Sequence, residues 1–228
     1  MEKYQNINII YEDNHLLVVH KPANMPVCKD ESTDEDLLSK LKEYLKIKYD
    51  KKGQVYLGLV HRLDRPVEGI IVFAKTSKAA SRLSKQINNH QFQKTYYAVV
   101  ENTPKKTGKF NDYLIKNEKT NTSYVTTKDK GKESILEYLV ISSINNLSLV
   151  KINLLTGRHH QIRVQFSYHG YSLYGDHKYN QHFLKDNKTN IALIAKKLSF
   201  YHPTTKELLT FEIDLPKKYP YTLFESNK

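Results

Sequence analysis

Two arginines and an aspartate stand close together in the stretch LVHRLDRPVEG, residues 59–69. Arg62, Asp64 and Arg65 lie between the apolar runs VYLGLV and IIVFA, which are typical of buried strands. Cations within ~4–6 Å lower the pKa of a carboxylate, so Asp64 is expected to stay ionised, as a nucleophile or general base requires. The alternative is an ordinary surface turn, in which Asp64 pairs with either arginine.

A second polar stretch, LLTGRHHQIRVQFSYHG, spans residues 154–170. The letters TGR predict a turn after a strand, followed by a helix that begins near His159 or His160. Backbone N–H groups at a helix start attract phosphate, and Arg158 adds positive charge there. Arg163 lies one helical turn further on and faces either solvent or a cleft. Adjacent histidines point in different directions on a helix, and no Cys, Asp or Glu stands nearby at ligand spacing, so we expect no metal site.

Two shorter stretches carry further candidates. In QKTYYAVV, residues 93–100, strand alternation places Tyr96 and Tyr97 on opposite faces. One tyrosine therefore faces away from the main core or toward a cleft, unless both simply pack on the two faces of a sheet. In YGDHKYN, residues 174–180, Asp176 follows a turn signal. It is either a second catalytic carboxylate or an ordinary loop acid.

The elements that must position these residues are mostly strands. Hydrophobic alternation predicts strands over 7–11, 16–21, 55–62, 69–75, 94–102, 110–117, 122–128, 134–143, 147–155, 191–200 and 208–214. Helical spacing predicts helices over 34–48, 77–88 and 159–170. Ser32 and Glu35 read as a capping box for the first helix, and Gly170 as the end of the third. Strands outnumber helices without alternating regularly with them, which predicts an α+β fold on a large, mostly antiparallel sheet.

Composition narrows the class of protein. The 228 residues suit one large domain or two intimately packed halves, and 39% hydrophobic residues supply a core. A net charge of +12 favours a polyanionic partner such as nucleic acid, although a solubilising lysine-rich surface is the alternative. The single cysteine, Cys28, excludes an internal disulfide, and no apolar run is long enough to span a membrane. We expect a cytoplasmic protein that acts as a monomer.

Taken together, the motifs resemble the RluA-type RNA pseudouridine synthases. H-R-L-D with a glycine five residues on, then K-x-Y, T-G-R-x-H-Q-I-R and G-D-x-x-Y occur in that family's order, and the resemblance covers about residues 7–214. It implies the pseudouridine synthase fold, with a large mixed sheet, flanking helices and a central catalytic cleft. It also implies one catalytic domain over 1–228, no separate S4 RNA-binding domain, no cofactor and no metal.

The resemblance also implies an activity and a site. The reaction would be the isomerisation of uridine to pseudouridine in ribosomal or transfer RNA, with Asp64 as the catalytic carboxylate. Tyr96 of K-x-Y would stack on the target base, and Arg163 of H-Q-I-R would pair with Asp64. Arg62 would help to displace the target nucleotide, which must leave its stack before reaction. The further residues expected to contact RNA are Arg158, His160 and Gln161.

One departure from the family pattern bears on function. The family usually has Thr-Ser before the glycine of its first motif, where this chain has Val67-Glu68. If Glu68 faced the cleft, it would raise the pKa of Asp64 or repel phosphate, so we expect it to point away. A catalytically silent RNA-binding protein of the same fold is the alternative function. A glycoside hydrolase would need a second carboxylate facing Asp64, and neither Glu68 nor Asp176 is a firm candidate.

Overall fold

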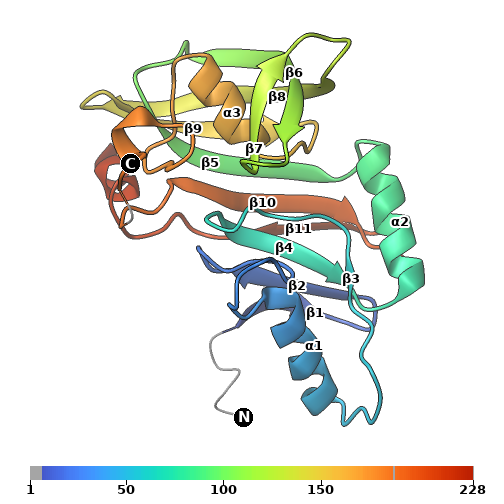
Figure 1. The fold of residues 1–228 in the computed structure, drawn as a ribbon. Helices are drawn as coiled ribbons and strands as arrows, with labels where there is room; N and C mark the ends of the chain where they lie inside the picture. The colour runs from blue at the N-terminus through green and yellow to red at the C-terminus, as the bar shows by residue number, and fades with distance from the viewer. Residues whose placement is uncertain (1–6, 187, 228) are drawn as a thin grey trace. The chain divides into compact units, whose positions relative to one another are not determined.

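The chain folds as two compact units. A computed structural model describes residues 7–186 and 188–227 (Figure 1). Unit 1 comprises the described residues of Met1–Gln93 and Lys197–Ile213, and unit 2 those of Lys94–Lys196 and Asp214–Lys228. Each unit has its own strands, helices and buried side chains.

Unit 1 is built from short antiparallel strands. Its elements are β1 (Asn8–Glu12), β2 (Leu16–Lys21), α1 (Leu37–Lys48), β3 (Gly58–Leu59), β4 (Glu68–Ala74), α2 (Ser77–Asn88) and β11 (Leu208–Glu212). β2 pairs with β1 and with β4, and β4 also pairs with β3. β11 pairs with β10 (Leu193–Tyr201), whose first residues belong to unit 2. All of these ladders are antiparallel, as the strand pattern predicts.

The start of α1 differs from the prediction. Ser32 and Glu35 do not form a capping box, and the helix begins three residues later than expected. Asp36 is the N-cap, because its carboxylate accepts a hydrogen bond from the N–H of Ser39 at 2.9 Å. The Ser32 hydroxyl instead donates to Asp30 in the preceding loop. Ser32 therefore takes part in a hydrogen bond within the loop and does not cap the helix.

The predicted strand over 55–62 is also mostly wrong, because only Gly58–Leu59 joins a ladder. Beyond these two residues, the backbone N–H of Val72 in β4 donates to Nε2 of His61 at 3.2 Å. An imidazole thus takes the place of a strand carbonyl. The chain leaves the sheet at this point and enters the polar turn that precedes β4.

α2 matches its prediction at both ends. Thr76 is its N-cap and accepts a hydrogen bond from the N–H of Ala79 at 3.1 Å. The amide group of Gln86 bonds to the N–H and C=O of Tyr201, at 2.8 and 2.7 Å, and so fixes the helix to β10. The core of unit 1 comprises Leu16, Val18, Ile70, Val72, Ala74, Ala79, Leu83, Phe92, Leu198 and Phe200. Burial of these side chains holds α2 against the strands.

Unit 2 is a five-stranded antiparallel arrangement with one α-helix. Its elements are β5 (Gln93–Glu101, whose first residue belongs to unit 1), β6 (Thr107–Asn117), β7 (Thr122–Thr126), β8 (Lys132–Ile144), β9 (Leu147–Leu154), α3 (Gln161–Tyr168) and short 3₁₀ helices at Gln181–Phe183 and Tyr221–Asn227. The strands pair in the order β5-β9-β8-β6-β7. With the antiparallel ladders of unit 1, this confirms the predicted α+β fold class.

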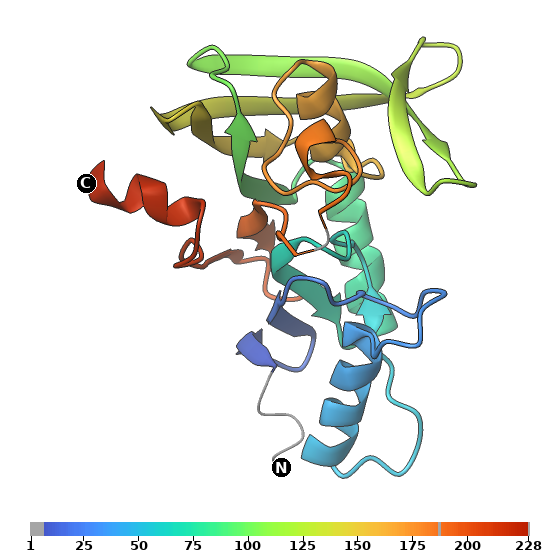
Figure 2. The ribbon, with the colours of Figure 1, turned by 60° about the vertical axis from the view of Figure 1, so that its left-hand side comes forward.

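The β6–β7 hairpin extends past the neighbouring strand. β8 pairs with β6 from Thr107 to Leu114, whereas β7 pairs with β6 from Tyr113 to Asn117. The end of β6 therefore has β7 as its only ladder partner among the described residues, and Figure 2 shows the hairpin projecting from the long strands. Such a hairpin needs contacts elsewhere in unit 2 to hold its tip.

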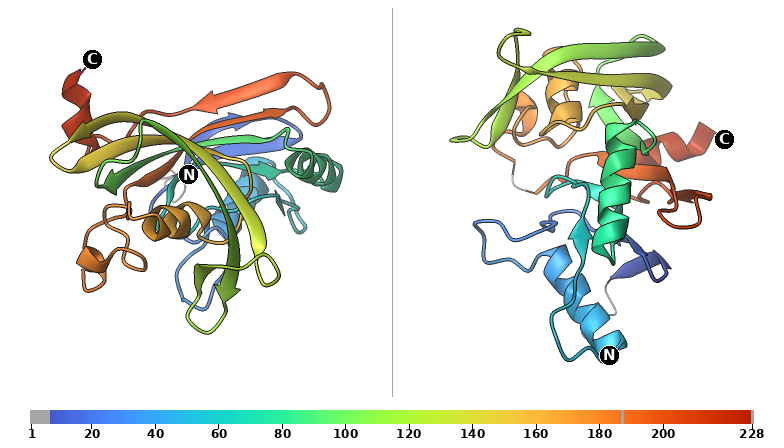
Figure 3. Two further views of the ribbon diagram at one scale, coloured as in Figure 1. Left: turned by 90° about the horizontal axis from the view of Figure 1, so that it is seen from above. Right: turned by 90° about the vertical axis from the view of Figure 1, so that its right-hand side faces the viewer.

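α3 lies against the curved strands of unit 2 and carries the second polar motif (Figure 3). The ring of Phe166 packs at 5.1 Å from Phe110 in β6 and at 5.5 Å from Tyr138 in β8. Gly170, with φ of +85°, follows the last turn, and the N–H groups of Gly170 and Tyr171 bond back to helix carbonyls at 3.1 and 2.8 Å. This Schellman motif confirms that Gly170 ends the helix.

Candidate functional site

Asp64 sits on a tight turn between buried anchors in unit 1. Its carbonyl accepts the N–H of Val67 at 3.0 Å, which closes the turn. Leu63 and Val67 are buried on either side, whereas Asp64 itself is partly exposed. Gly69 follows with φ of +131°, a conformation that side chains rarely allow. Gly69 thus allows the backbone conformation that follows the turn carrying Asp64.

A buried cation lies beside this turn. Lys21 has no exposed surface, and its Nζ donates to the carbonyls of Pro22, Met25 and Arg65 at 2.9, 2.8 and 3.0 Å. Burial lowers the pKa of Lys21 to about 7, partly offset by the negative charges of Asp64 and Glu68. Lys21 therefore ties the end of β2 to the backbone of the turn and places a titratable ammonium near the carboxylate.

Arg65 does not serve as the main partner of Asp64. Its guanidinium contacts Asp34, and also Asp30 at 3.2 Å and the Ser32 hydroxyl at 2.9 Å. The loop before α1 thus holds Arg65, and the ordinary-turn interpretation is wrong for this arginine. Arg62 is exposed at the surface.

Tyr96 lies in β5 opposite Ile152 of β9 and is 6% exposed. The neighbouring Tyr97 is partly exposed, and Nζ of Lys196 lies 5.5 Å from the centre of its ring. The two tyrosines therefore differ in burial, as the alternation predicts. The ring of Tyr97 lies next to Lys196 in unit 2, whereas the side chain of Tyr96 is almost fully buried.

Gln161 braces the turn that leads into α3. It is buried, and its Oε1 accepts the Thr156 hydroxyl at 2.8 Å and the N–H of Arg158 at 3.0 Å. Its Nε2 donates to the carbonyl of Ile135 and to Oε1 of Gln165, at 3.1 and 3.0 Å. Both ends of the amide are occupied, so Gln161 fixes the shape of this turn. The exposed Arg158 side chain lies on its surface.

Arg163 has a buried carboxylate as its partner in unit 2. Its Nε and Nη2 donate to the two oxygens of Asp176 at 2.8 and 2.7 Å. The side chains are 4% and 0% exposed, respectively. Two parallel bonds fix the plane of the guanidinium as well as its position. Asp176 is therefore no ordinary loop acid, because it holds the arginine that the sequence singled out.

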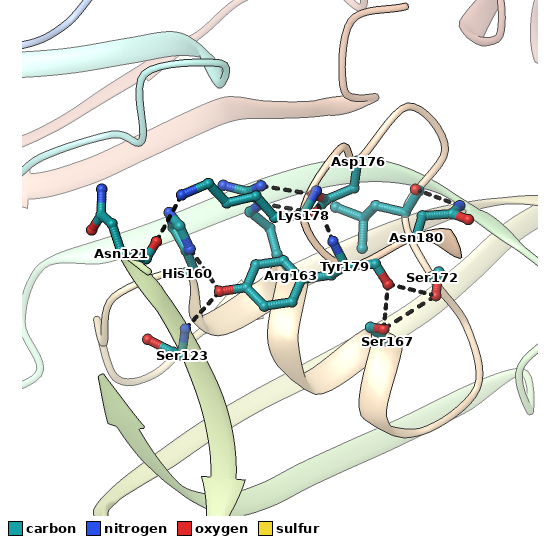
Figure 4. Close-up of polar contacts among 11 residues, drawn as sticks. Asn121, Ser123, His160, Arg163, Ser167, Ser172, Asp176, Lys178, Tyr179 and Asn180 are labelled. Atoms are coloured by element: carbon teal, nitrogen blue, oxygen red, sulfur yellow. Dashed lines mark hydrogen bonds and ion pairs between the residues drawn. The ribbon is translucent and has the colours of Figure 1, made fainter. Parts of the chain in front are cut away.

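Asp176 also shapes its own turn. Its Oδ1 accepts the backbone N–H groups of Lys178 and Tyr179 at 2.9 and 3.3 Å. This Asx-type turn places the Tyr179 ring 5.1 Å from the guanidinium carbon of Arg163 (Figure 4). One carboxylate thus organises both the arginine and the aromatic ring beside it.

His160 is a neutral, anchored histidine. It precedes α3 in the left-handed conformation, with φ of +53°, and is 8% exposed. Burial, followed by the positive charge of Arg163, lowers the pKa of His160 to about 2. Its Nδ1 lies 2.7 Å from the Tyr179 hydroxyl, and its ring stacks on His159 at 3.8 Å. The imidazole therefore carries no charge at neutral pH.

The structure gathers the expected site residues into two groups. Asp64 and Arg62 come together on one turn of unit 1, beside Lys21. Four of the others surround the start of α3 in unit 2, and Tyr96 lies on β5 of the same unit. The residues in unit 2 are Tyr96, Arg158, His160, Gln161 and Arg163. Sequence reasoning missed Lys21 and Tyr179, although Tyr179 stands in the G-D-x-x-Y motif and could have been found there.

Residues 7–186 and 188–227 contain neither a metal-binding cluster nor a membrane-spanning helix. No group of three or more His, Cys, Asp or Glu side chains in that part of the chain is arranged to hold a metal ion. Within the same residues, no helix has the length and apolar character needed to cross a membrane.

Sequence and structure comparisons agree on one group of relatives. Residues 15–168 match the family model described as RNA pseudouridylate synthase. The chain is 33% identical over 221 residues to ribosomal large subunit pseudouridine synthase D of Zymomonas mobilis subsp. mobilis. This match covers 92% of this chain and 70% of that protein. It is 32% identical over 220 residues to ribosomal large subunit pseudouridine synthase C of Buchnera aphidicola subsp. Baizongia pistaciae, over 92% and 68% of the two chains.

A solved structure is similar in fold. Human RNA pseudouridylate synthase domain containing 4 superposes with a TM-score of 0.78, over 95% of this chain and 92% of that one. The two sequences are 22% identical, so this likeness supports the fold alone.

Proposed function

Because the chain belongs to the RNA pseudouridylate synthase family and is therefore an isomerase, we propose that it converts specific uridines of ribosomal or transfer RNA to pseudouridine, with Asp64 as its catalytic carboxylate. The observation that carries the assignment of Asp64 is the turn on which it lies. Buried Leu63 and Val67 anchor that turn, and Gly69 adopts the positive φ of the backbone that follows it. Nζ of Lys21 donates to the carbonyl of Arg65 within the turn. Packing and hydrogen bonds of this kind are expected around a side chain that must keep one geometry.

The reaction breaks the bond between uracil N1 and ribose C1′ and joins C5 of the turned base to C1′. A carboxylate is able to assist as a nucleophile toward the sugar, as a nucleophile toward the base or as a base toward a sugar proton. Each path requires Asp64 to be ionised and within reach of the nucleotide. The proposal names the residue and leaves these three paths as alternatives.

The remaining site residues receive separate roles. We propose that Tyr96 stacks on the target base and that Arg163 pairs with Asp64. Arg62, which is exposed beside Asp64, would fill the space that the target nucleotide leaves. Arg158 and His160 would contact RNA at the start of α3, with Gln161 holding their turn in shape. No role in this scheme requires a cofactor or a metal.

Ribosomal RNA is the first substrate to test. The relatives from Zymomonas and Buchnera are both named as ribosomal large subunit synthases. A net charge of +12 suits a polyanion of this kind, and it would make binding weaken as salt rises. Ribosomal and transfer RNA are both present in the cytoplasm, where we propose that the protein acts as a monomer.

The test is tritium release from RNA labelled at C5 of uridine, with ribosomal and transfer RNA transcripts compared. Formation of pseudouridine must release that hydrogen to water, so the assay requires no knowledge of the modified position. Asp64→Asn is expected to lower turnover by at least about 10³-fold while the Kd for RNA stays within about twofold. Asp50→Asn is the matched control, because Asp50 is exposed and its φ of +45° suits asparagine.

The outcomes separate the alternatives. Release from one RNA class that depends on Asp64 and is unaffected by Asp50→Asn supports the proposal and names the substrate class. Near-normal release by Asp64→Asn would exclude Asp64 as the catalytic residue. Intact RNA binding without release from either RNA class would favour the catalytically silent RNA-binding protein.

A further inference from the structure

Tyr179 contacts more of unit 2 than its place in a loop suggests. Its hydroxyl accepts the backbone N–H of Ser123 in β7 at 2.7 Å and lies 2.7 Å from Nδ1 of His160. Its ring lies against Arg163, and its carbonyl accepts the Ser167 hydroxyl at 2.7 Å. Figure 4 shows these contacts converging on one residue from β7, from the residue before α3 and from α3 itself.

The tip of the β6–β7 hairpin is held by the same turn. Nζ of Lys178 donates to the carbonyl of Asn121 at 2.8 Å, next to the bond between Tyr179 and Ser123. Two adjacent residues, Lys178 and Tyr179, therefore fasten the hairpin, where the end of β6 pairs with β7 beyond the end of β8. The hairpin and the start of α3 are linked through Tyr179.

One hydrogen bond joins the Tyr179 hydroxyl to Nδ1 of His160. The Ser123 N–H is a donor only, so the Tyr179 oxygen must accept there. A hydroxyl oxygen has more than one lone pair, so the Tyr179 hydroxyl either donates its hydrogen to Nδ1 of His160 or accepts a hydrogen from it. Both tautomers of the neutral imidazole keep this hydrogen bond.

We propose that Tyr179 is a positioning residue with two separable tasks: its ring supports the guanidinium of Arg163, and its hydroxyl holds His160 and the β6–β7 hairpin. This inference rests on the proposed function, in which Arg163 acts in the chemical step and His160 contacts RNA. The ring works together with Asp176, which fixes one edge of the same guanidinium. A cation beside an aromatic face gains stability when both are shielded from water.

The two tasks predict different kinetic effects. Removal of the hydroxyl alone takes away one hydrogen bond to the hairpin and one to His160, and it leaves the ring beside Arg163 in place. It should therefore weaken RNA binding and spare the chemical step. Removal of the ring also releases one side of Arg163, and the chemical step should slow as well.

Kinetics of tritium release test this separation. Tyr179→Phe is expected to raise KM for RNA about three- to tenfold, with kcat within about twofold, because two hydrogen bonds are lost. Tyr179→Leu is expected to lower kcat by about tenfold or more in addition. Tyr168→Phe is the matched control, because Tyr168 ends α3 with 64% of its surface exposed, and neither parameter should change.

A spectroscopic measurement tests the hydroxyl independently of turnover. A long-range ¹H–¹⁵N spectrum of the histidine rings, assigned with His160→Gln, should resolve the Nδ1 resonance of His160. In Tyr179→Phe the Nδ1 resonance should shift, whereas in Tyr168→Phe it should stay in place. If the Nδ1 resonance stayed in place in Tyr179→Phe, the proposed hold of the hydroxyl on His160 would be overturned.

The combined outcomes separate this inference from the proposed function. If neither variant of Tyr179 changed KM or kcat while the wild type turned over, Tyr179 would not position the site. If both lowered kcat and KM stayed constant, the two tasks would not be separable and the inference would fail. If the wild type released no tritium, the proposed function would fail, and the spectrum would still decide whether Tyr179 holds His160.

Discussion

Replacement of Glu12 by glutamine is expected to destabilise unit 1 in a pH-dependent way. The Glu12 side chain in β1 is 7% exposed and accepts four hydrogen bonds. Lys48 and Tyr44 donate to Oε2 at 2.7 and 2.9 Å, and Tyr49 and Lys75 donate to Oε1 at 2.7 and 2.8 Å. One carboxylate thus joins β1, α1 and the end of β4. Glutamine keeps the shape but loses the charge and presents an NH₂ group to two donors.

The size of the effect follows from the pKa. Burial alone would raise the pKa of Glu12, but the hydrogen bonds from Lys48, Lys75 and the two tyrosines lower it to about 2 from an ordinary 4.5. At about 1.4 kcal/mol per pH unit, this corresponds to an upper limit of about 3 kcal/mol. Lys48 is 43% exposed, so water screens part of the attraction, and we expect about 1–2 kcal/mol.

The sign sets the pH window. Because the folded pKa lies below the unfolded pKa, the stabilisation is complete above about pH 4.5 and is lost as the pH falls toward about 2. Urea unfolding at pH 7, 4 and 3 should show the difference between wild type and Glu12→Gln shrinking across that series. Glu43→Gln, at an exposed position of α1, is the control and should change little. A difference that stayed constant with pH would refute the reasoning.

Two further changes probe the surroundings of the proposed site. The folded pKa of Lys21, about 7, lies below its ordinary 10.5, so the unfolded chain binds more protons between these values and stability rises with pH. Urea titrations should show the wild type gaining about 1–2 kcal/mol over Lys21→Met from pH 7 to 9, and a flat difference would contradict this. Gly175→Ala should lower stability by about 2 kcal/mol or more, because φ is +74° and a Cβ would collide with the carbonyl of Asn190. Gly53→Ala, with open space around it, should unfold at the wild-type urea concentration.

Strands and helices with strong hydrophobic periodicity could be predicted from sequence. β2 and α2 occur at the residues that alternation and helical spacing indicate. Predictions failed where a side chain took over a backbone task. His61 replaces a strand carbonyl for Val72, and Asp36 takes the N-cap that Ser32 was expected to occupy. Such substitutions depend on three-dimensional neighbours that periodicity does not report.

The sequence indicated some residues of the candidate site but not others. Asp64 could be singled out because two arginines and a glycine surround it within a few positions. Lys21 could not, because its partners are three backbone carbonyls, which any sequence supplies. Its importance follows from burial of an ammonium, and burial of a single lysine at a strand end is not visible in the pattern.

Sequence spacing did not indicate that Asp176 binds Arg163. Asp176 follows Arg163 by thirteen residues and lies outside the helix, so no helical repeat connects the two. The Schellman motif at Gly170 reverses the chain after α3, and the Asx-type turn at Asp176 then returns its carboxylate to the helix. Two oxygens of Asp176 occupy Nε and part of Nη2, so the other N–H groups of Arg163, including both on Nη1, are left to other partners. Because Asp176 already neutralises one edge of Arg163, this arginine contributes to the site more through the fixed orientation of its guanidinium than through its charge. On this reasoning Arg163→Lys, which keeps the charge and loses the planar geometry, belongs with the inactive variants rather than with the conservative ones.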